Sequence, residues 1–225
     1  MRTALGLCLV IAARAELARA GACGMLVQVS PAASPMPRDG LVLVEVVGQH
    51  ADVLAHAHFV TPNGDVPARV VRQVENGRLQ ALLAPARALS PGQIHVALGL
   101  ADIDRVLATE PIDVGDATAP TLEWKGKPSV VRAVDIASNK GDGTHAMLVK
   151  TPVTAPGWVV ATITADEHST DVIYPIANGT VTIGTAGCFS AYFVDHAGAK
   201  RVELTAIGAA GRSVAAPGPI TLHFR

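Results

Sequence analysis

The sequence predicts an all-β protein: two antiparallel β-sandwich domains in tandem after a cleaved signal peptide. Three observations lead to this fold class. Three Asn-Gly pairs lie between strand-like runs, and Asn-Gly is the dipeptide that best tolerates the positive φ angles of a two-residue hairpin turn. Short runs rich in β-branched residues recur about every 8 to 14 residues, with Pro and Gly between them. After the first 20 residues, no segment shows a convincing helical period.

The first 20 residues have the features of a secretory signal peptide. Arg2 gives the positive start, residues 4–13 form an apolar run, and residues 18–20 form a small-x-small cleavage site. The apolar run is too short to span a bilayer, and charged residues interrupt it before it could lengthen. The sequence therefore predicts an exported protein whose mature chain starts at Gly21 and has no transmembrane helix.

Composition predicts a folded, globular chain that does not bind nucleic acid. Hydrophobic residues make up 49% of the sequence and charged residues 16%, which is too apolar for disorder. Removing Arg2, Arg14, Arg19 and Glu16 with the signal peptide leaves 15 basic and 18 acidic residues, so no basic field for nucleic acid remains. Because aromatic residues are scarce, the two tryptophans, Trp124 and Trp158, are expected in a core or at a domain interface.

Two cysteines remain after export, Cys23 and Cys188, because Cys8 lies in the signal peptide. An even pair in an oxidising compartment predicts a disulfide, which in the chain-entropy model contributes on the order of 5 kcal/mol for so long a loop. The alternative is a lipid anchor on Cys23, since residues 20–23 resemble a degenerate lipoprotein cleavage box. Ala20 replaces the usual large aliphatic residue of such a box, and this departure favours the disulfide.

In the first half of the mature chain, two Asn-Gly pairs predict a three-stranded meander. Asn63-Gly64 and Asn76-Gly77 separate its strands. Residues 101–109 have a partly helical spacing and are interpreted as a loop or a strand. The strand-like runs of this half cover residues 41–47, 51–60, 66–74, 78–84 and 94–100.

In the second half, Asn178-Gly179 is expected to form the clearest hairpin, joining residues 171–177 to 180–184. At residues 201–207 the apolar and polar residues alternate, which indicates one buried face and one solvated face. The other strand-like runs cover residues 130–136, 158–164 and 190–194. A linker-like break at residues 115–120 divides the mature chain into domains at residues 21–115 and 116–225.

Both halves resemble known secreted modules. Ser30-Pro31, residues 37–40 and the turn at residues 89–92 (Leu-Ser-Pro-Gly) resemble bacterial immunoglobulin-like modules. The second half resembles a fibronectin type III module in its Ala197-Gly198 turn, its following strand and its closing strand at residues 219–225. The resemblance implies an immunoglobulin-like β-sandwich followed by a fibronectin type III-like one, and such folds do not by themselves give a function.

A metal site is one candidate for chemistry. His56 and His58 would share a face of a strand and could offer two imidazoles to one metal, with His50 and His95 nearby. Periplasmic copper-resistance proteins share this sandwich class and the Leu-x-Pro-Gly turn, so a closer resemblance would imply exported copper binding. The sequence departs from that family at its mature start, Gly21, where the family typically has a histidine ligand. The alternative is that the two histidines are ordinary surface residues of a solvent-facing strand.

Other clusters are interpreted as turns. Asp166, Glu167, His168 and Asp171 could hold calcium, but they lack the spacing of a dedicated calcium loop and are expected in a solvated turn. Residues 140–143 lack the phosphate-binding pattern of a P-loop. Asn178 also matches a glycosylation sequon, although the Asn-Gly turn already explains it.

No hydrolase motif is present: we find no Gly-x-Ser-x-Gly, Ser-x-x-Lys or His-Glu-x-x-His pattern. The sequence therefore predicts an exported, non-catalytic structural or interaction protein, for binding or adhesion, in the periplasm or at the cell surface. We nominate no catalytic, cofactor or metal residue, and the partner is an unidentified protein or cell-surface component. The alternatives are a periplasmic copper-binding protein and an accessory domain of a hydrolase.

Overall fold

The computed structural model describes residues 26–47, 53–76, 78–100, 103–108, 110–136, 144–165, 168–184 and 198–224. Within these residues every regular element is a β-strand, which confirms the predicted all-β class. No helical segment of this described part has the length and apolar character that crossing a membrane requires. The predicted signal peptide, Cys23, Cys188, His50 and the predicted strand at residues 190–194 lie outside the described residues.

The first half forms one strongly bent antiparallel sheet in the order β1-β2-β5-β4-β3-β6-β7, with β8 paired to β6. Strand β4 pairs with β5 along most of its length and with β3 at its start, so the sheet bends around a core. A parallel bridge between Met36 and Val114 brings the two ends of the sheet close to closure. The strands are β1 (Leu26–Pro31), β2 (Val42–Val47), β3 (His58–Val60), β4 (Val66–Glu75), β5 (Leu79–Pro85), β6 (Gly92–Leu100), β7 (Ile103–Ala108) and β8 (Ile112–Val114).

The second half consists of two smaller antiparallel sheets. One has the order β13-β10-β9, and the other has the order β12-β11-β14-β15 with β16 also paired to β14. A core that includes Val149 and Ile183 from the first sheet and Ile163 and Leu204 from the second lies between them. The strands are β9 (Ser129–Ile136), β10 (Thr144–Lys150), β11 (Gly157–Ala165), β12 (His168–Pro175), β13 (Thr180–Gly184), β14 (Gly198–Gly208), β15 (Ser213–Ala215) and β16 (Ile220–Phe224).

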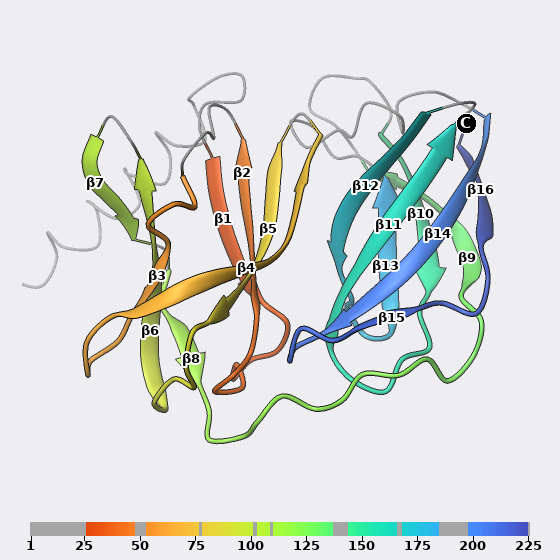
Figure 1. Ribbon diagram of the computed structural model, residues 1–225. Coiled ribbons are helices and arrows are strands. Elements are labelled where there is room, and N and C mark those ends of the chain that lie inside the picture. The colour runs from red at the N-terminus through yellow and green to blue at the C-terminus, as the bar shows by residue number, and fades with distance from the viewer. Residues whose placement is uncertain are drawn as a thin grey trace, which may run out of the picture.

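A third apolar cluster joins the two halves, which lie side by side in Figure 1. Its members come from β2, the residue before it, β4 and β5 in the first half, and from β11, β12 and β14 in the second. The five-stranded sheet is therefore covered on both faces, by the three-stranded sheet on one side and by the first half on the other. The buried members are Leu41, Leu43, Val74, Leu82, Ala84, Trp158, Val160, Ile173 and Ile207.

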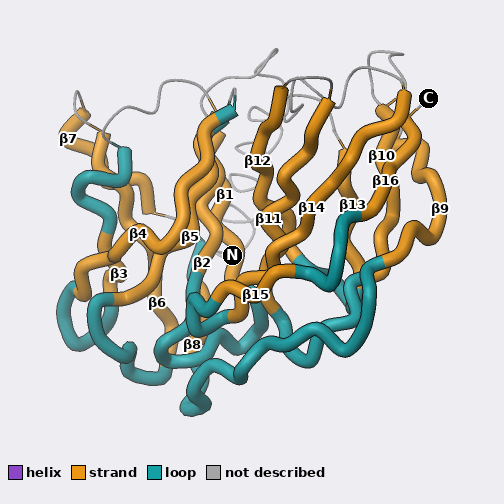
Figure 2. Tube along the Cα trace, turned by 45° about the vertical axis from the view of Figure 1, so that its right-hand side comes forward, coloured by secondary structure: helices purple, strands orange, loops and turns teal. Residues whose placement is uncertain are grey.

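The segment between β8 and β9 is attached to both halves along its course, which follows the lower side of the strands in Figure 2. The Arg38 N–H donates to the Ala117 carbonyl at 2.9 Å, and the Ala119 N–H donates to Asp39 Oδ1 at 2.7 Å. Leu122 is buried against the second half. This predicted linker is thus held in place by hydrogen bonds and packing on either side.

Most predicted strands are confirmed with small shifts of their ends. The expected alternation at residues 201–207 is present in β14, where Val202, Leu204 and Ala206 are buried. Residues 101–109 include a strand, β7. The strand expected over residues 51–60 is wrong in its first part, because a turn precedes His58, where β3 begins.

The hairpin predicted at Asn178-Gly179 is also wrong in part. The turn exists, with φ angles of 51° and 70° at these two residues. However, β12 pairs with β11 and β13 pairs with β10. The pairing across the turn is therefore a single bridge between Ala177 and Thr180, the residues on either side of it. The physical reason is burial: apolar side chains of β12 and β13 enter the same core from opposite sheets.

Candidate binding site at the junction of the two halves

A row of polar side chains crosses the face of the first half that meets the second half. Gln28 on β1 is opposite Glu45 on β2, and Glu45 is opposite Gln80 on β5. Cross-strand partners point to the same side of a sheet, so the three side chains form one row. Glu45 and Gln80 each interrupt an otherwise apolar strand, and they lie next to the buried apolar cluster between the halves.

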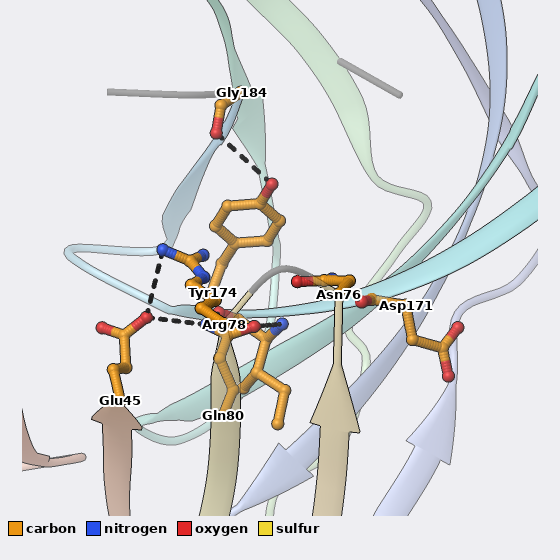
Figure 3. Close-up of polar contacts among 8 residues, drawn as sticks. Glu45, Asn76, Arg78, Gln80, Asp171, Tyr174 and Gly184 are labelled. Atoms are coloured by element: carbon orange, nitrogen blue, oxygen red, sulfur yellow. Dashed lines mark hydrogen bonds and ion pairs between the residues drawn. The ribbon is translucent and has the colours of Figure 1, made fainter. Parts of the chain in front are cut away.

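Gln80 is fully buried and joins the two halves through its side-chain amide. Its Nε2 donates to the Ile173 carbonyl and to Glu45 Oε1, both at 2.7 Å, and its Oε1 accepts the Ile173 N–H at 2.9 Å. Strand β12, which contains Ile173, is an edge strand of its sheet. The Gln80 amide therefore satisfies backbone groups that a neighbouring strand would otherwise bind, as Figure 3 shows.

Arg78 and Glu45 form an ion pair beside this amide. Arg78 Nη1 lies 3.4 Å from Glu45 Oε1, and only 10% and 15% of the two side chains are exposed. Because both charges are largely removed from water, each depends on its partner for stabilisation. In Figure 3 the side chains of Arg78 and Gln80 converge on the Glu45 carboxylate.

Tyr174 completes the polar groups of this junction. Its hydroxyl donates to the Gly184 carbonyl at 3.4 Å, a long hydrogen bond (Figure 3). Burial raises the pKa of Tyr174 to about 12, and the positive charge of Arg78 opposes part of this rise. The phenol is therefore neutral and able to donate a hydrogen bond over the whole physiological pH range.

These side chains surround a cleft of about 210 Å³ between the two halves. Pro175 contributes an apolar surface to the lining, while Glu45, Arg78 and Tyr174 contribute hydrogen-bonding groups. Small-molecule sites occur preferentially at such domain interfaces and combine apolar walls with a few fixed polar groups. The described residues that line the cleft are Gln28, Glu45, Arg78, Ile173, Tyr174, Pro175 and Gly184.

The sequence did not predict Glu45, Arg78, Gln80 or Tyr174 as site residues. A signal was present for two of them, because a glutamate and a glutamine inside apolar strands need a polar partner when the strand is buried. No comparable local signal marks Arg78, which follows an Asn-Gly turn, or Tyr174, whose ring belongs to an apolar core.

Asp171, a member of the predicted acidic cluster, lies at the same junction. Its carboxylate binds Arg72 of the first half and accepts a hydrogen bond from Thr162 Oγ1 at 2.6 Å. Asn76 Nδ2 donates to the Asp171 backbone carbonyl. Asp171 thus contributes to the contact between the halves, and Asp166 and Glu167 lie outside the described residues.

The predicted histidine pair is not arranged as two neighbours on one strand. His56 lies in the turn before β3, and a Cβ placed on Gly99 would come within 3.1 Å of its side chain. His58 begins β3, with Nδ1 2.8 Å from the His56 carbonyl and Nε2 3.5 Å from Asp65 Oδ2. Across the described part of the chain, no three His, Cys, Asp or Glu side chains are grouped as a metal site would require.

His95 lies on β6 opposite Val60, whereas His58 is opposite Ala97. The two histidines therefore share a face of the sheet but are displaced by two residues along it.

Comparison with known proteins shows only distant structural similarity. No protein-family model and no curated protein matches this sequence. Among solved structures, the pullulanase type I of Bacillus subtilis strain 168, complexed with maltose, aligns with a TM-score of 0.26 and 10% sequence identity. The alignment covers 87% of this chain, and this chain spans about a quarter (25%) of the length of that one.

Proposed function

We propose that this chain is an exported, non-catalytic interaction protein whose two β units act as one rigid binding body. An immunoglobulin-like unit at residues 21–115 is supported by the strand order β1-β2-β5-β4 with β3-β6-β7, which corresponds to the ABED and CFG sheets of a constant-type domain. A fibronectin type III-like unit at residues 116–225 is supported by three strands packed against β12-β11-β14-β16.

The observation that carries the proposal is the cleft between the units. Its lining comes from strands of both halves, and the buried amide of Gln80 fixes these halves relative to each other. Binding sites built on packed strands hold their side chains more accurately than sites on loops. A polar cleft on a rigid two-unit scaffold is suited to recognising a ligand.

Export is the second part of the proposal and depends on the signal-peptide features of residues 1–20. The intact mass of the protein purified from an exporting bacterial host tests it. We expect a chain that starts at Gly21 and is two hydrogens lighter than its reduced form, because of a Cys23–Cys188 disulfide. A mass that retains Met1 would contradict export, and an acyl group on Cys23 would replace the disulfide by a lipid anchor.

The same preparation tests the non-catalytic part. Ester, peptide and glycoside substrates should show no turnover above a buffer blank. Turnover that copurifies with the protein and disappears in Glu45→Gln would contradict the proposal and make the cleft an active site.

A further inference from the structure

We propose that the cleft binds a single neutral ring or short chain that carries hydroxyl groups on adjacent carbons, such as one sugar ring or a polyol. The adjacent hydroxyls would be held by Glu45 and Arg78. This inference rests on the proposed function, because it takes the cleft as a site that binds its ligand without transforming it.

The charges that line the cleft favour a neutral ligand. Arg78 Nη1 and Glu45 Oε1 lie 3.4 Å apart. An anion attracted by the guanidinium would therefore be repelled by the carboxylate, and a cation attracted by the carboxylate would be repelled by the guanidinium. A carboxylate only accepts hydrogen bonds and a guanidinium only donates them. Two hydroxyls on adjacent carbons satisfy both groups at once, since one donates to Glu45 while the other accepts from Arg78.

The polar groups are held in place before any ligand arrives. Gln80 holds Glu45 Oε1 at 2.7 Å, and the Ile173 backbone holds Gln80 in turn. Ordered, partly desolvated groups lose little entropy on binding and interact more strongly than groups in water. The long 3.4 Å bond of the Tyr174 hydroxyl leaves that group able to turn toward a ligand.

The size of the cleft limits the ligand to about one ring. Drug-sized ligands occupy pockets of about 300–1,000 Å³, and this cleft has about 210 Å³. Pro175 offers an apolar surface for the C–H face of a ring. Among the described residues that line the cleft, Tyr174 is the one aromatic residue, so this part of the lining offers no series of stacking surfaces for a longer glycan chain.

The test is an NMR titration of ¹⁵N-labelled mature protein with the two anomers of methyl glucopyranoside. For a ligand this small we expect a dissociation constant on the order of millimolar. The amide signals of Ile173 and Gly184 should shift in a saturable way. Cyclohexanol, glucuronate and glucosamine, which lack the diol or carry a charge, should bind about tenfold more weakly or worse.

Two variants locate the binding. Gln28 is exposed at the edge of the cleft, so Gln28→Trp should fill the cleft and abolish the shifts while the protein remains folded. Gln73→Trp is the matched control, because Gln73 is exposed on β4 and is not part of the lining. Glu45→Gln should weaken binding about tenfold.

The inference is overturned if no saturable shift occurs below about 100 mM ligand, a concentration that would detect even very weak binding. It is also overturned if Gln28→Trp binds as well as wild type, or if the charged sugars bind as tightly as the neutral ones. A different result would contradict the proposed non-catalytic function: release of methanol from the methyl glycoside during the titration would show that the protein hydrolyses its ligand.

Discussion

Replacing Gln80 by Met should destabilise the protein strongly although the two side chains have similar volumes. The substitution removes three hydrogen bonds and leaves the N–H and carbonyl of Ile173 buried without their partner. Each such buried backbone group costs about 1–3 kcal/mol, and the bond to the charged Glu45 adds about 1.5 kcal/mol. We therefore expect the free energy of unfolding to fall by at least about 3.5 kcal/mol.

Urea denaturation followed by tryptophan fluorescence measures this loss. With a slope of about 2.5 kcal/mol/M, the midpoint should fall by about 1.5 M without a change in slope. The control is Gln73→Met on β4, which is exposed and should change stability by less than about 0.5 kcal/mol. A loss below about 1 kcal/mol in Gln80→Met would show that the Ile173 N–H and carbonyl do not depend on the Gln80 amide, because leaving two buried backbone groups without partners should cost more than that.

Three further predictions concern packing and ionisation. Trp158→Ala should cost about 3–5 kcal/mol in urea denaturation, because the indole is fully buried between the halves. Gly157→Ala should lower the melting temperature, since its new Cβ would lie 2.3 Å from the Ile207 carbonyl oxygen, whereas Gly126→Ala, where the nearest atom is 3.8 Å away, should not. Tyr174 should ionise near pH 12 in an ultraviolet titration of the folded protein. Because its pKa is about 10 when unfolded, the stability it contributes is complete below pH 10 and declines from about pH 10 to about 12, a decline absent in Tyr174→Phe.

Local patterns predicted the strands of this protein well, because a strand with one buried face shows alternating apolar and polar residues in its sequence. The alternation of Val202, Leu204 and Ala206 with polar residues was sufficient to define β14 and its buried face. Asn63-Gly64 and Asn178-Gly179 mark real turns. Asn178-Gly179 shows the limit of this signal, since a turn defines a local change of direction and not the sheet that the next strand joins.

The contact between the two halves could not be predicted from local patterns. Residues of β5 and β11 are buried on both faces, and a continuous apolar run indicates double burial without saying what covers the second face. The cleft could not be predicted from local patterns either. Gln80 and Ile173 are 93 positions apart, so only the packing of the two halves brings their hydrogen-bonding groups together.

The two halves share one buried core, and we expect them to unfold as one cooperative body. Differential scanning calorimetry of the purified mature protein tests it most directly, by comparing the calorimetric enthalpy with the van't Hoff enthalpy. We predict one transition in wild type with a ratio near one, because the buried cluster around Trp158 and Leu82 couples the halves. Two separate transitions, or one transition with a ratio near two, would contradict the shared core and with it the rigid cleft.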